Sequence, residues 1–182
     1  ELLISQVERC TQILKKLSLN PNEEDDFIHE DIDLRGYVSQ IISSFQETSN
    51  KNFVLNFDQD SNPQKISNSI EIIYGLRNFI GNANKFAKNK IFITIKSNNN
   101  YSELVIEDDG QGYPSEILSK IGEPYLRSLN EKKEKKTGLG LGIFIGKTLL
   151  EKNFASIKCQ NSKTRTGAEV CIRWKNEDLS KI

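Results

Sequence analysis

Two asparagines and a lysine lie on one face of the helix predicted for SIEIIYGLRNFIGNANKFAKN, residues 69–89. At about 100° per residue, Asn78, Asn82 and Lys85 fall within about 60° of one another, and apolar residues gather on the opposite side. Asparagine carbonyl oxygens suit a hard cation such as Mg²⁺, and the lysine offers positive charge to phosphate. Alone, the pattern also fits an ordinary solvent-facing helix side.

A carboxylate and two glycines follow a predicted strand in IEDDGQGYP, residues 106–114. Asp108, Gly110 and Gly112 form the pattern D-x-G-x-G. The carboxylate can accept a hydrogen bond from the exocyclic amine of a purine, and the glycines let the backbone lie against a flat ring. The same residues also suit a structural turn.

Four glycines interrupt the apolar helix pattern of KTGLGLGIFIGKTLLE, residues 136–151, although each interior glycine costs a helix roughly 1 kcal/mol relative to alanine. The GKT at 146–148 is not a P-loop, which needs four residues between its first glycine and the GKT; three separate it from Gly142 and five from Gly140. A dinucleotide fingerprint fails as well, because no strand precedes the glycines. Residues 137–142 therefore predict a helix N-terminus with unobstructed N–H groups, which is an anion site.

The elements that position these motifs predict an α+β fold, one sheet layered against helices. The periodicity predicts helices at 34–47 and 69–88, a strand at 52–57, a hairpin of 90–96 with 102–108, a short helix at 114–121 and closing strands at 155–160 and 168–174. A charged loop at 126–137 precedes the glycine-rich helix. Residues 3–17 carry a coiled-coil-like apolar repeat, and residues 18–26 have the composition of a linker.

Composition excludes several classes of protein. The 25 basic and 25 acidic side chains balance, so no domain-wide basic field is available for nucleic acid. The three cysteines, Cys10, Cys159 and Cys171, predict neither a disulfide framework nor a zinc site, and the two on strands are expected in the core. No stretch approaches the ~18 to 20 apolar residues of a membrane span, and without an initiating methionine or signal peptide the chain is expected to be a piece of a longer protein.

The order N-x-x-x-N-A-x-K-F, D-x-G-x-G, T-G-L-G-L-G resembles the N, G1 and G2 boxes of the GHKL ATP-binding fold, as found in the catalytic domain of sensor histidine kinases. GEPYLRS, residues 122–128, is similar to the F box of kinases rather than to the gyrase, MutL and Hsp90 branches. IGEPY and GLGLGIFIGKTLLE are similar to the redox-responding RegB/PrrB/ActS group. Tyr113, where an aliphatic residue is common, is a mild departure.

The resemblance implies a GHKL (Bergerat) two-layer α/β sandwich, a mixed sheet packed on helices, preceded by a helix from the dimerisation hairpin. Residues 1–20 would be part of the second helix of that dimerisation and phosphoacceptor hairpin, and residues 21–28 a linker. Residues 29–176 would form the ATP-binding catalytic domain, with a tail at 177–182.

The resemblance also implies ATP and Mg²⁺ as cofactors and a role for each matching residue. Asn82 would bind Mg²⁺ with support from Asn78, and Lys85 would face the phosphates as the third catalytic residue. Asp108 would hold the adenine amine. The remaining nucleotide contacts would come from Phe86, Gly110 and Gly112 near the base, from Tyr125 and Arg127 of a mobile lid, and from Thr137, Gly138, Leu139, Gly140, Leu141 and Gly142 around the triphosphate.

Cys10 matches the redox-active cysteine of that kinase group. On a dimer seam it could form an intermolecular disulfide that links oxidation to kinase output, or it could be a small hydrophobic residue of a bundle core. The resemblance further implies a homodimer through the N-terminal helix, a response regulator receiver domain as partner, no nucleic acid, no membrane contact by this fragment, and a cytoplasmic kinase portion of an inner-membrane sensor.

The expected activity is transfer of the ATP γ-phosphoryl to a histidine, for relay to a response regulator. His29, the only histidine, lacks the Thr-Pro that usually follows an acceptor, so the acceptor is expected on an upstream helix absent from this sequence. Two alternatives stay open: a stand-alone GHKL serine kinase or anti-sigma-type binding module, and a degenerate nucleotide sensor with only a structural output.

Overall fold

The computed structural model describes residues 32–58, 65–66, 69–124, 141–179 and 181–182. Several predicted features lie outside these residues: the hairpin helix with Cys10, the linker at 21–28, His29, and Tyr125, Arg127, Thr137, Gly138, Leu139 and Gly140. The roles expected of these residues stay predictions.

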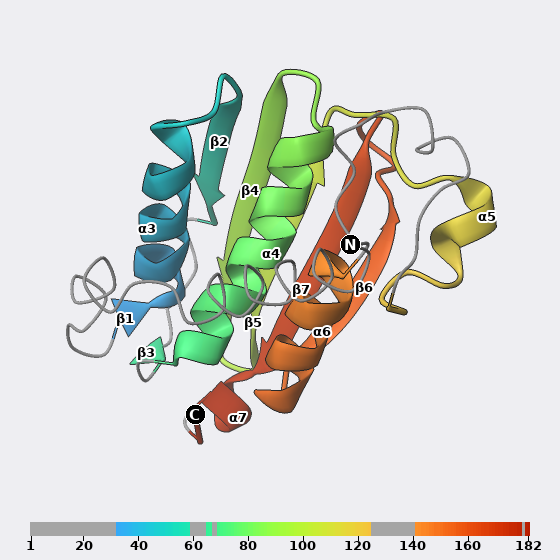
Figure 1. The fold of residues 1–182 in the computed structure, drawn as a ribbon. Coiled ribbons are helices and arrows are strands. Elements are labelled where there is room, and N and C mark those ends of the chain that lie inside the picture. The colour runs from blue at the N-terminus through green and yellow to red at the C-terminus, as the bar shows by residue number, and fades with distance from the viewer. Residues whose placement is uncertain (1–31, 59–64, 67–68, 125–140, 180) are drawn as a thin grey trace, which may run out of the picture. The chain divides into compact units, whose positions relative to one another are not determined.

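A five-stranded mixed sheet forms one layer, with strand order β2-β4-β5-β7-β6 (Figure 1). One parallel pairing joins β2 (Asn52–Phe57) to β4 (Lys90–Ser97), and antiparallel pairings join β4 to β5 (Tyr101–Asp108), β5 to β7 (Ala168–Lys175) and β7 to β6 (Ser156–Asn161). The predicted hairpin and the two closing strands are confirmed. The mixed sheet packed on helices confirms the predicted fold class.

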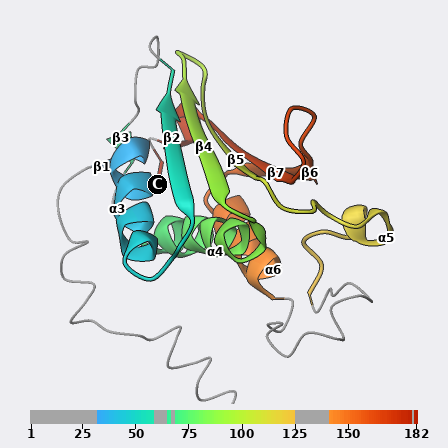
Figure 2. The same cartoon turned by 90° about the horizontal axis from the view of Figure 1, so that it is seen from above.

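Three helices form the second layer and lie on one face of the sheet (Figure 2). They are α3 (Leu34–Gln46), α4 (Ile70–Phe86) and α6 (Gly142–Lys152). The remaining elements are short: β1 (Ile32–Asp33) pairs with β3 (Lys65–Ile66), α5 (Ser115–Leu118) follows β5, and α7 (Asn176–Leu179) follows β7. None of the helices in the described ranges is long and apolar enough to cross a membrane.

Helix α4 carries the amide residues and is fixed by its cap and its apolar face. The Ser69 Oγ accepts a hydrogen bond from the Ile72 N–H at 3.4 Å, and Glu71 in the first turn complements the helix dipole. The residues that the 3.6-residue period assigns to the core are buried, as predicted: Ile72, Ile73, Leu76, Phe79, Ile80, Ala83 and Ala87. Burial of this face sets the direction of the polar face.

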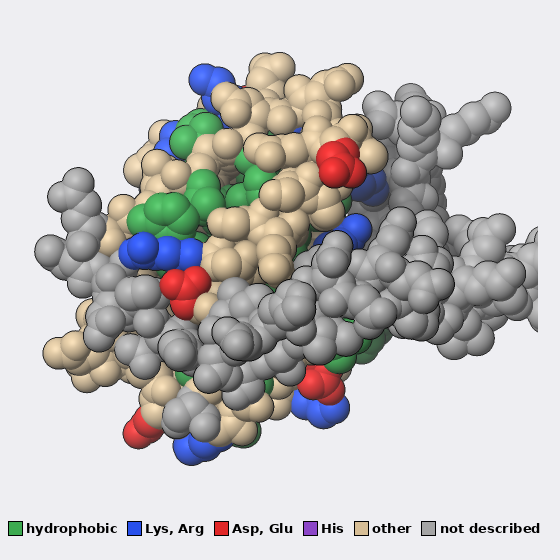
Figure 3. Space-filling view, turned by 90° about the vertical axis from the view of Figure 1, so that its left-hand side faces the viewer, with side chains coloured by type: hydrophobic (Ala, Val, Ile, Leu, Met, Phe, Trp, Pro, Cys, Tyr) green, Lys and Arg blue, Asp and Glu red, His purple; other side chains and the backbone are tan. Residues whose placement is uncertain are grey.

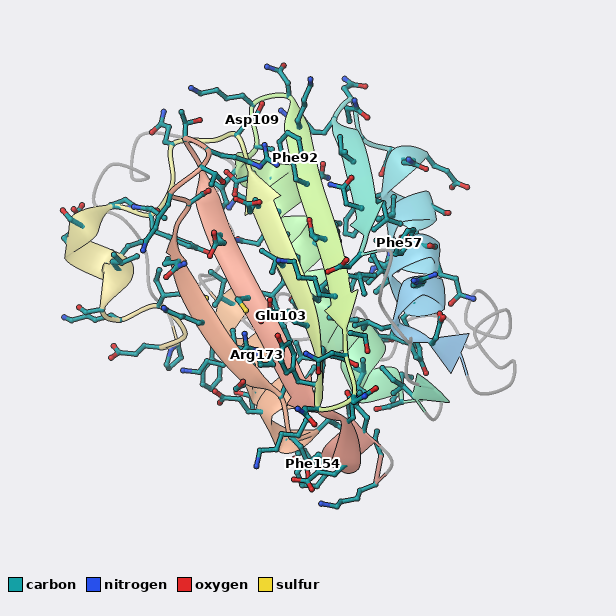
Figure 4. All side chains as sticks on the ribbon, turned by 180° about the vertical axis from the view of Figure 1, so that it is seen from behind. Phe57, Phe92, Glu103, Asp109, Phe154 and Arg173 are labelled. Carbon is teal, nitrogen blue, oxygen red and sulfur yellow. The ribbon has the colours of Figure 1, made fainter. Side chains whose placement is uncertain are left out.

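Alternate strand residues complete the core between the two layers. In β4 and β5 the helix-facing residues are Ile91, Ile93, Ile95, Leu104 and Ile106, all buried. Trp174 of β7 is fully buried, and its indole N–H donates to the Asn153 carbonyl at 3.1 Å. Polar residues such as Glu103 and Arg173 point to the other face of the sheet, which the helices leave uncovered (Figure 4).

Two cysteines in the described part lie on strands but are only half-buried, so the expectation that they belong to the core is wrong. Cys171 alternates with the buried Val170 and Ile172 and therefore lies on the sheet face away from the helices. Burial raises the pKa of each thiol to about 11. Both thiols are therefore protonated at neutral pH, and the thiolate is the nucleophilic form of cysteine.

The chain after β7 forms helix α7, whose Leu179 is buried. The predicted end of the domain at residue 176 coincides with the first residue of this helix, and the predicted domain boundaries stay predictions.

Figure 3 shows one face of the molecule, on which basic and acidic side chains are interspersed rather than gathered into a basic patch.

Candidate functional site

The polar face of α4 presents one amide in a fixed orientation. The Asn78 Nδ2 donates to the Tyr74 carbonyl, one turn earlier, at 2.8 Å. Its Oδ1 lies near the start of α6, because a Cβ placed on Gly142 would be 3.6 Å from that oxygen. Asn78 and Asn82 are half-buried, and Lys85 is exposed with its Nζ 4.6 Å from the centroid of the Phe86 ring.

Helices α4 and α6 pack closely through a glycine on each. A Cβ on Gly75 would lie 2.5 Å from Leu150 Cγ, and one on Gly146 would lie 3.0 Å from Phe79 Cε2 and 3.1 Å from Asn78 Cβ. Helix packing therefore explains Gly146. It does not explain Gly142, whose added Cβ would meet only an ordinary van der Waals contact.

The start of α6 has no side-chain cap. Its N-cap residue Leu141, which is half-buried, has no oxygen in its side chain to accept from the first N–H groups, whereas the side chains of Asp33 and Ser69 cap α3 and α4. The first N–H groups of a helix need an acceptor, and an anion can supply it.

Asp108 ends β5 with its carboxylate buried and oriented. The residue is 4% exposed, and its Oδ1 accepts from the Gly110 N–H at 2.8 Å and from the Ala168 N–H at 3.2 Å. Burial outweighs these two hydrogen bonds and raises the pKa of Asp108 above its ordinary value. Within the described part of the chain, Oδ2 accepts no hydrogen bond, so it can accept one from a ligand donor.

The D-x-G-x-G turn lies directly against the C-terminal end of α4. A Cβ on Gly110 would overlap the Phe86 carbonyl oxygen. The next carboxylate strengthens this contact, because Asp109 Oδ1 accepts from the Lys88 N–H at 2.8 Å and the Asn89 N–H at 3.0 Å. Burial alone would raise the pKa of Asp109, but the backbone N–H groups reverse that effect and lower it.

One helix therefore connects the two predicted halves of the site. Asn78 faces the start of α6, Phe86 contacts the D-x-G-x-G turn, and Asn82 lies one turn from each. The eight residue-to-residue steps from Asn78 to Phe86 span roughly 12 Å of helix axis. The structure thus brings Asn78 close to Gly142 at one end of this stretch and Phe86 close to Gly110 at the other end, with Asn82 between them.

Sequence reasoning missed three residues of the β6–β7 hairpin end that hold this site. A Cβ on Gly167 would overlap both the Asp108 carbonyl and its Oδ1, and Ala168 donates to that carboxylate. Asn161 contacts Gly112, which has a left-handed φ of 74°. These residues follow Asp108 by about fifty residues or more, so no local spacing could have indicated them.

A two-layer mixed sheet and helices, with an amide-bearing helix that ends against a D-x-G-x-G turn, define the GHKL class of ATP-binding domain. The chain belongs to the histidine kinase-, DNA gyrase B- and HSP90-like ATPase family, whose sequence profile matches residues 67–178. This confirms the family that the motif order predicts.

Sensor kinases are among the similar proteins. The sensor histidine kinase RegB of Cereibacter sphaeroides is 38% identical over 97 residues, which cover 50% of this chain and 21% of RegB. The sensor histidine kinase CssS of Bacillus subtilis is 34% identical over 97 residues, which cover 53% of this chain and 20% of CssS. The chain thus spans about a fifth of the length of these relatives.

Solved histidine kinase structures share the fold. The mycobacterial sensor histidine kinase MprB matches with a TM-score of 0.68 at 18% identity, covering 80% of this chain and 97% of that structure. Full-length ShkA in complex with AMPPNP matches with a TM-score of 0.64 at 19% identity, covering 80% of this chain and 30% of that one.

Proposed function

We propose that this chain is the ATP-binding catalytic part of a sensor histidine kinase, which transfers the γ-phosphoryl of ATP to a histidine on a dimerisation hairpin. The observation that carries the proposal is the placement of α4, whose polar face joins the uncapped start of α6 to the turn that holds Asp108. One end offers a carboxylate acceptor for adenine, and the other offers amide oxygens for a metal ion and the first N–H groups of α6 for phosphates.

The residues suit a bound nucleotide and metal. The Asp108 carboxylate would accept from the adenine amine, with Gly110 and Gly112 beside the base and Lys85 toward the phosphates. Among the described residues, no group of three or more His, Cys, Asp or Glu side chains could hold a metal ion. Asn82, with Asn78 beside it, would supply the protein's oxygen ligand to Mg²⁺, because amide oxygens suit this hard cation. The metal would neutralise phosphate charge, which together with positioning is most of what phosphoryl transfer requires.

Roles for the remaining predicted residues belong to the same proposal. Tyr125 and Arg127 would contact the nucleotide from a lid, and residues 137–141 would surround the triphosphate. The proposal also includes a homodimer through the N-terminal helix and a receiver-domain partner. It further includes a cytoplasmic kinase portion of an inner-membrane parent and redox control through Cys10.

A non-reducing gel tests the redox role of Cys10. Oxidation that crosslinks wild type but not Cys10→Ser would support this role, and equal crosslinking of the two would contradict it.

Calorimetric titration of ATP with and without Mg²⁺ tests the site. We expect Asn82→Ala to lose the affinity that Mg²⁺ adds, and Asp108→Ala to bind weakly with or without the metal. Asn84→Ala is a matched control, because Asn84 is on the same helix but accepts from Ser49 Oγ at 2.6 Å. Normal Mg-ATP binding by both site variants would contradict the proposal.

A phosphotransfer assay with a supplied histidine hairpin tests the activity itself. The proposal predicts radiolabel on the hairpin histidine that disappears in Asn82→Ala. Label on serine of a partner protein, or partner binding with no transfer, would favour the serine kinase or anti-sigma alternative. ATP binding with neither outcome would favour a degenerate nucleotide sensor.

A further inference from the structure

Asn161, the last residue of β6, binds both backbone groups of Tyr113. Its Oδ1 accepts from the Tyr113 N–H at 2.6 Å, and its Nδ2 donates to the Tyr113 carbonyl at 3.0 Å. By pairing with both the N–H and the carbonyl of one residue, the side-chain amide makes the two hydrogen bonds that the backbone of a neighbouring strand would make. It fixes the end of the D-x-G-x-G turn to a strand 48 residues away in the sequence.

Gly112 makes this close approach possible. Its φ of 74° is in the left-handed region, and a Cβ there would lie 2.6 Å from Asn161 Oδ1. Any side chain at 112 would both strain the backbone and push Asn161 away. The second glycine of D-x-G-x-G is therefore matched to Asn161.

The same hairpin end also holds the start of the turn. Asn161 pairs in register with Ala168, whose N–H donates to Asp108 Oδ1 at 3.2 Å. Gly167 lies against the Asp108 backbone and carboxylate. Asp108 and Tyr113, which bound the turn, are thus both attached to one pair of residues at the end of β6 and β7.

Glu107 fixes the hairpin turn in place. Its carboxylate accepts from Ser162 Oγ at 2.6 Å, Thr164 Oγ1 at 3.2 Å and Arg165 Nε at 3.3 Å. The Arg165 guanidinium carbon also lies 3.5 Å from the centroid of the Phe92 ring. Phe92 and Asp109 lie at the same end of the sheet (Figure 4). Because these contacts tie the turn to β4 and β5, Asn161 is a fixed anchor.

The Tyr113 side chain packs as a neutral phenol beside Cys159 of β6. Burial first, and then the neighbouring Cys159 and Asp108, raise the pKa of Tyr113 well above its ordinary value. The aromatic side chain and the backbone of Tyr113 therefore both attach to β6.

We propose that Asn161 is a positioning residue of the nucleotide site: by clamping Gly112 and Tyr113 to β6, it holds the turn that presents Asp108 and Gly110 to the base. The inference rests on the proposed function, because positioning has a purpose only where a base binds. Asn161 itself need not touch the nucleotide.

The test compares Asn161→Leu with Asn98→Leu in the full chain. Asn98 is a matched control, because its Oδ1 also accepts from two backbone N–H groups, those of Asn100 and Tyr101 at 2.8 and 2.9 Å. It precedes β5, whereas Asp108 ends that strand. Asn161→Leu therefore removes two hydrogen bonds to the segment that follows β5, and Asn98→Leu removes two at the start of β5.

We expect Asn161→Leu to weaken ADP binding in calorimetry about tenfold, since two hydrogen bonds are lost, while Asn98→Leu binds like wild type. In hydrogen exchange, the Gly110 and Tyr113 amides should exchange faster only in Asn161→Leu. Asn161→Asp, which keeps the acceptor but loses the donor, should give an intermediate ADP affinity and keeps the test valid if the leucine variant does not fold.

Two failures are distinguishable. Wild type that binds ADP, with equal affinity in the Asn161 and Asn98 variants, would overturn the positioning role and leave the proposed function standing. Wild type that binds no nucleotide would overturn the proposed function, and the positioning role with it. Unchanged exchange of Gly110 and Tyr113 in Asn161→Leu would overturn the clamp whatever the nucleotide result.

Discussion

The carbonyl oxygen of Phe86 occupies the space that a Cβ of Gly110 would need. Because the Phe86 carbonyl is backbone and the position of a Cβ is fixed by its own backbone, neither can rotate away, and Gly110→Ala must separate the turn from the end of α4. We expect this variant to lose roughly 1–3 kcal/mol of unfolding free energy and to bind ATP at least tenfold more weakly. Denaturant unfolding and calorimetry measure the two effects.

Gly81→Ala is the control for Gly110→Ala. Gly81 lies on α4, where a Cβ would be 3.1 Å from the end of the Phe45 ring, a side chain that can shift. Its ATP affinity should stay at the wild-type value. If Gly110→Ala binds ATP as well as Gly81→Ala does, the contact between Gly110 and Phe86 is not part of the nucleotide site.

Gly142 and Gly146 should respond differently to alanine although they belong to one glycine-rich motif. Gly142→Ala should leave unfolding free energy unchanged or raise it by up to about 1 kcal/mol, since alanine favours the helix and meets only an ordinary contact. Its ATP affinity should fall while adenosine affinity stays constant, because only phosphates need the bare start of α6. Gly146→Ala should lower stability through its contacts with Phe79 and Asn78. Unchanged ATP affinity in Gly142→Ala would contradict a phosphate role for Gly142.

The raised pKa of Asp108 predicts a pH dependence with opposite signs for stability and binding. Between the ordinary and the raised pKa the folded chain binds more protons at this group than the unfolded chain does, so the contribution of Asp108 to stability falls as pH rises through that window. Binding of the adenine amine needs the carboxylate, so adenosine affinity should fall as pH is lowered through the raised pKa. Calorimetric titration with adenosine at a series of pH values around the raised pKa measures this change in affinity.

The variant Asp108→Asn separates the effect of this carboxylate on stability from its effect on adenosine binding. The asparagine Oδ1 can still accept from Gly110 and Ala168 without a buried charge, so the variant should be at least as stable as wild type at neutral pH. Its Nδ2 would face the adenine amine with a donor, which should cost about 1–3 kcal/mol of binding at every pH. An adenosine affinity whose pH dependence survives in Asp108→Asn would assign that dependence to another group.

The sequence predicts the elements whose evidence is local. The 3.6-residue spacing of apolar residues gives α4 and the direction of Asn78 and Asn82, and the two-residue alternation gives the hairpin that ends at Asp108. The parallel pairing of β2 with β4 was not predicted, since some thirty residues that include α4 separate the two strands.

The supports of the site escape prediction for a physical reason. Asn161, Gly167 and Glu107 act through contacts with residues about fifty or more positions away. The sequence around Asn161 and Gly167 indicates only a polar turn, and nothing next to Glu107 in the sequence indicates its partners in the β6–β7 turn. The glycine-rich motif gives a second example, because its glycines have different roles that the sequence does not distinguish. Gly146 serves helix packing, which becomes visible only once Gly75 and Phe79 of α4 lie opposite it.

Phe154 has a strained backbone conformation far from the candidate site, so substitutions there should change stability without changing nucleotide binding. It follows α6 with a φ of 62°, a left-handed conformation that favours glycine, and it is 52% exposed. Its N–H donates to the Glu151 carbonyl at 3.1 Å, so a glycine can keep the bond. We expect Phe154→Gly to be more stable than Phe154→Ala by roughly 1 kcal/mol, because both remove the ring and only alanine keeps the strained Cβ. ATP affinity should be equal in the two variants, since Phe154 and Asp109 lie at opposite ends of the sheet (Figure 4). Equal unfolding free energies would mean that the chain relaxes out of the left-handed conformation at this position.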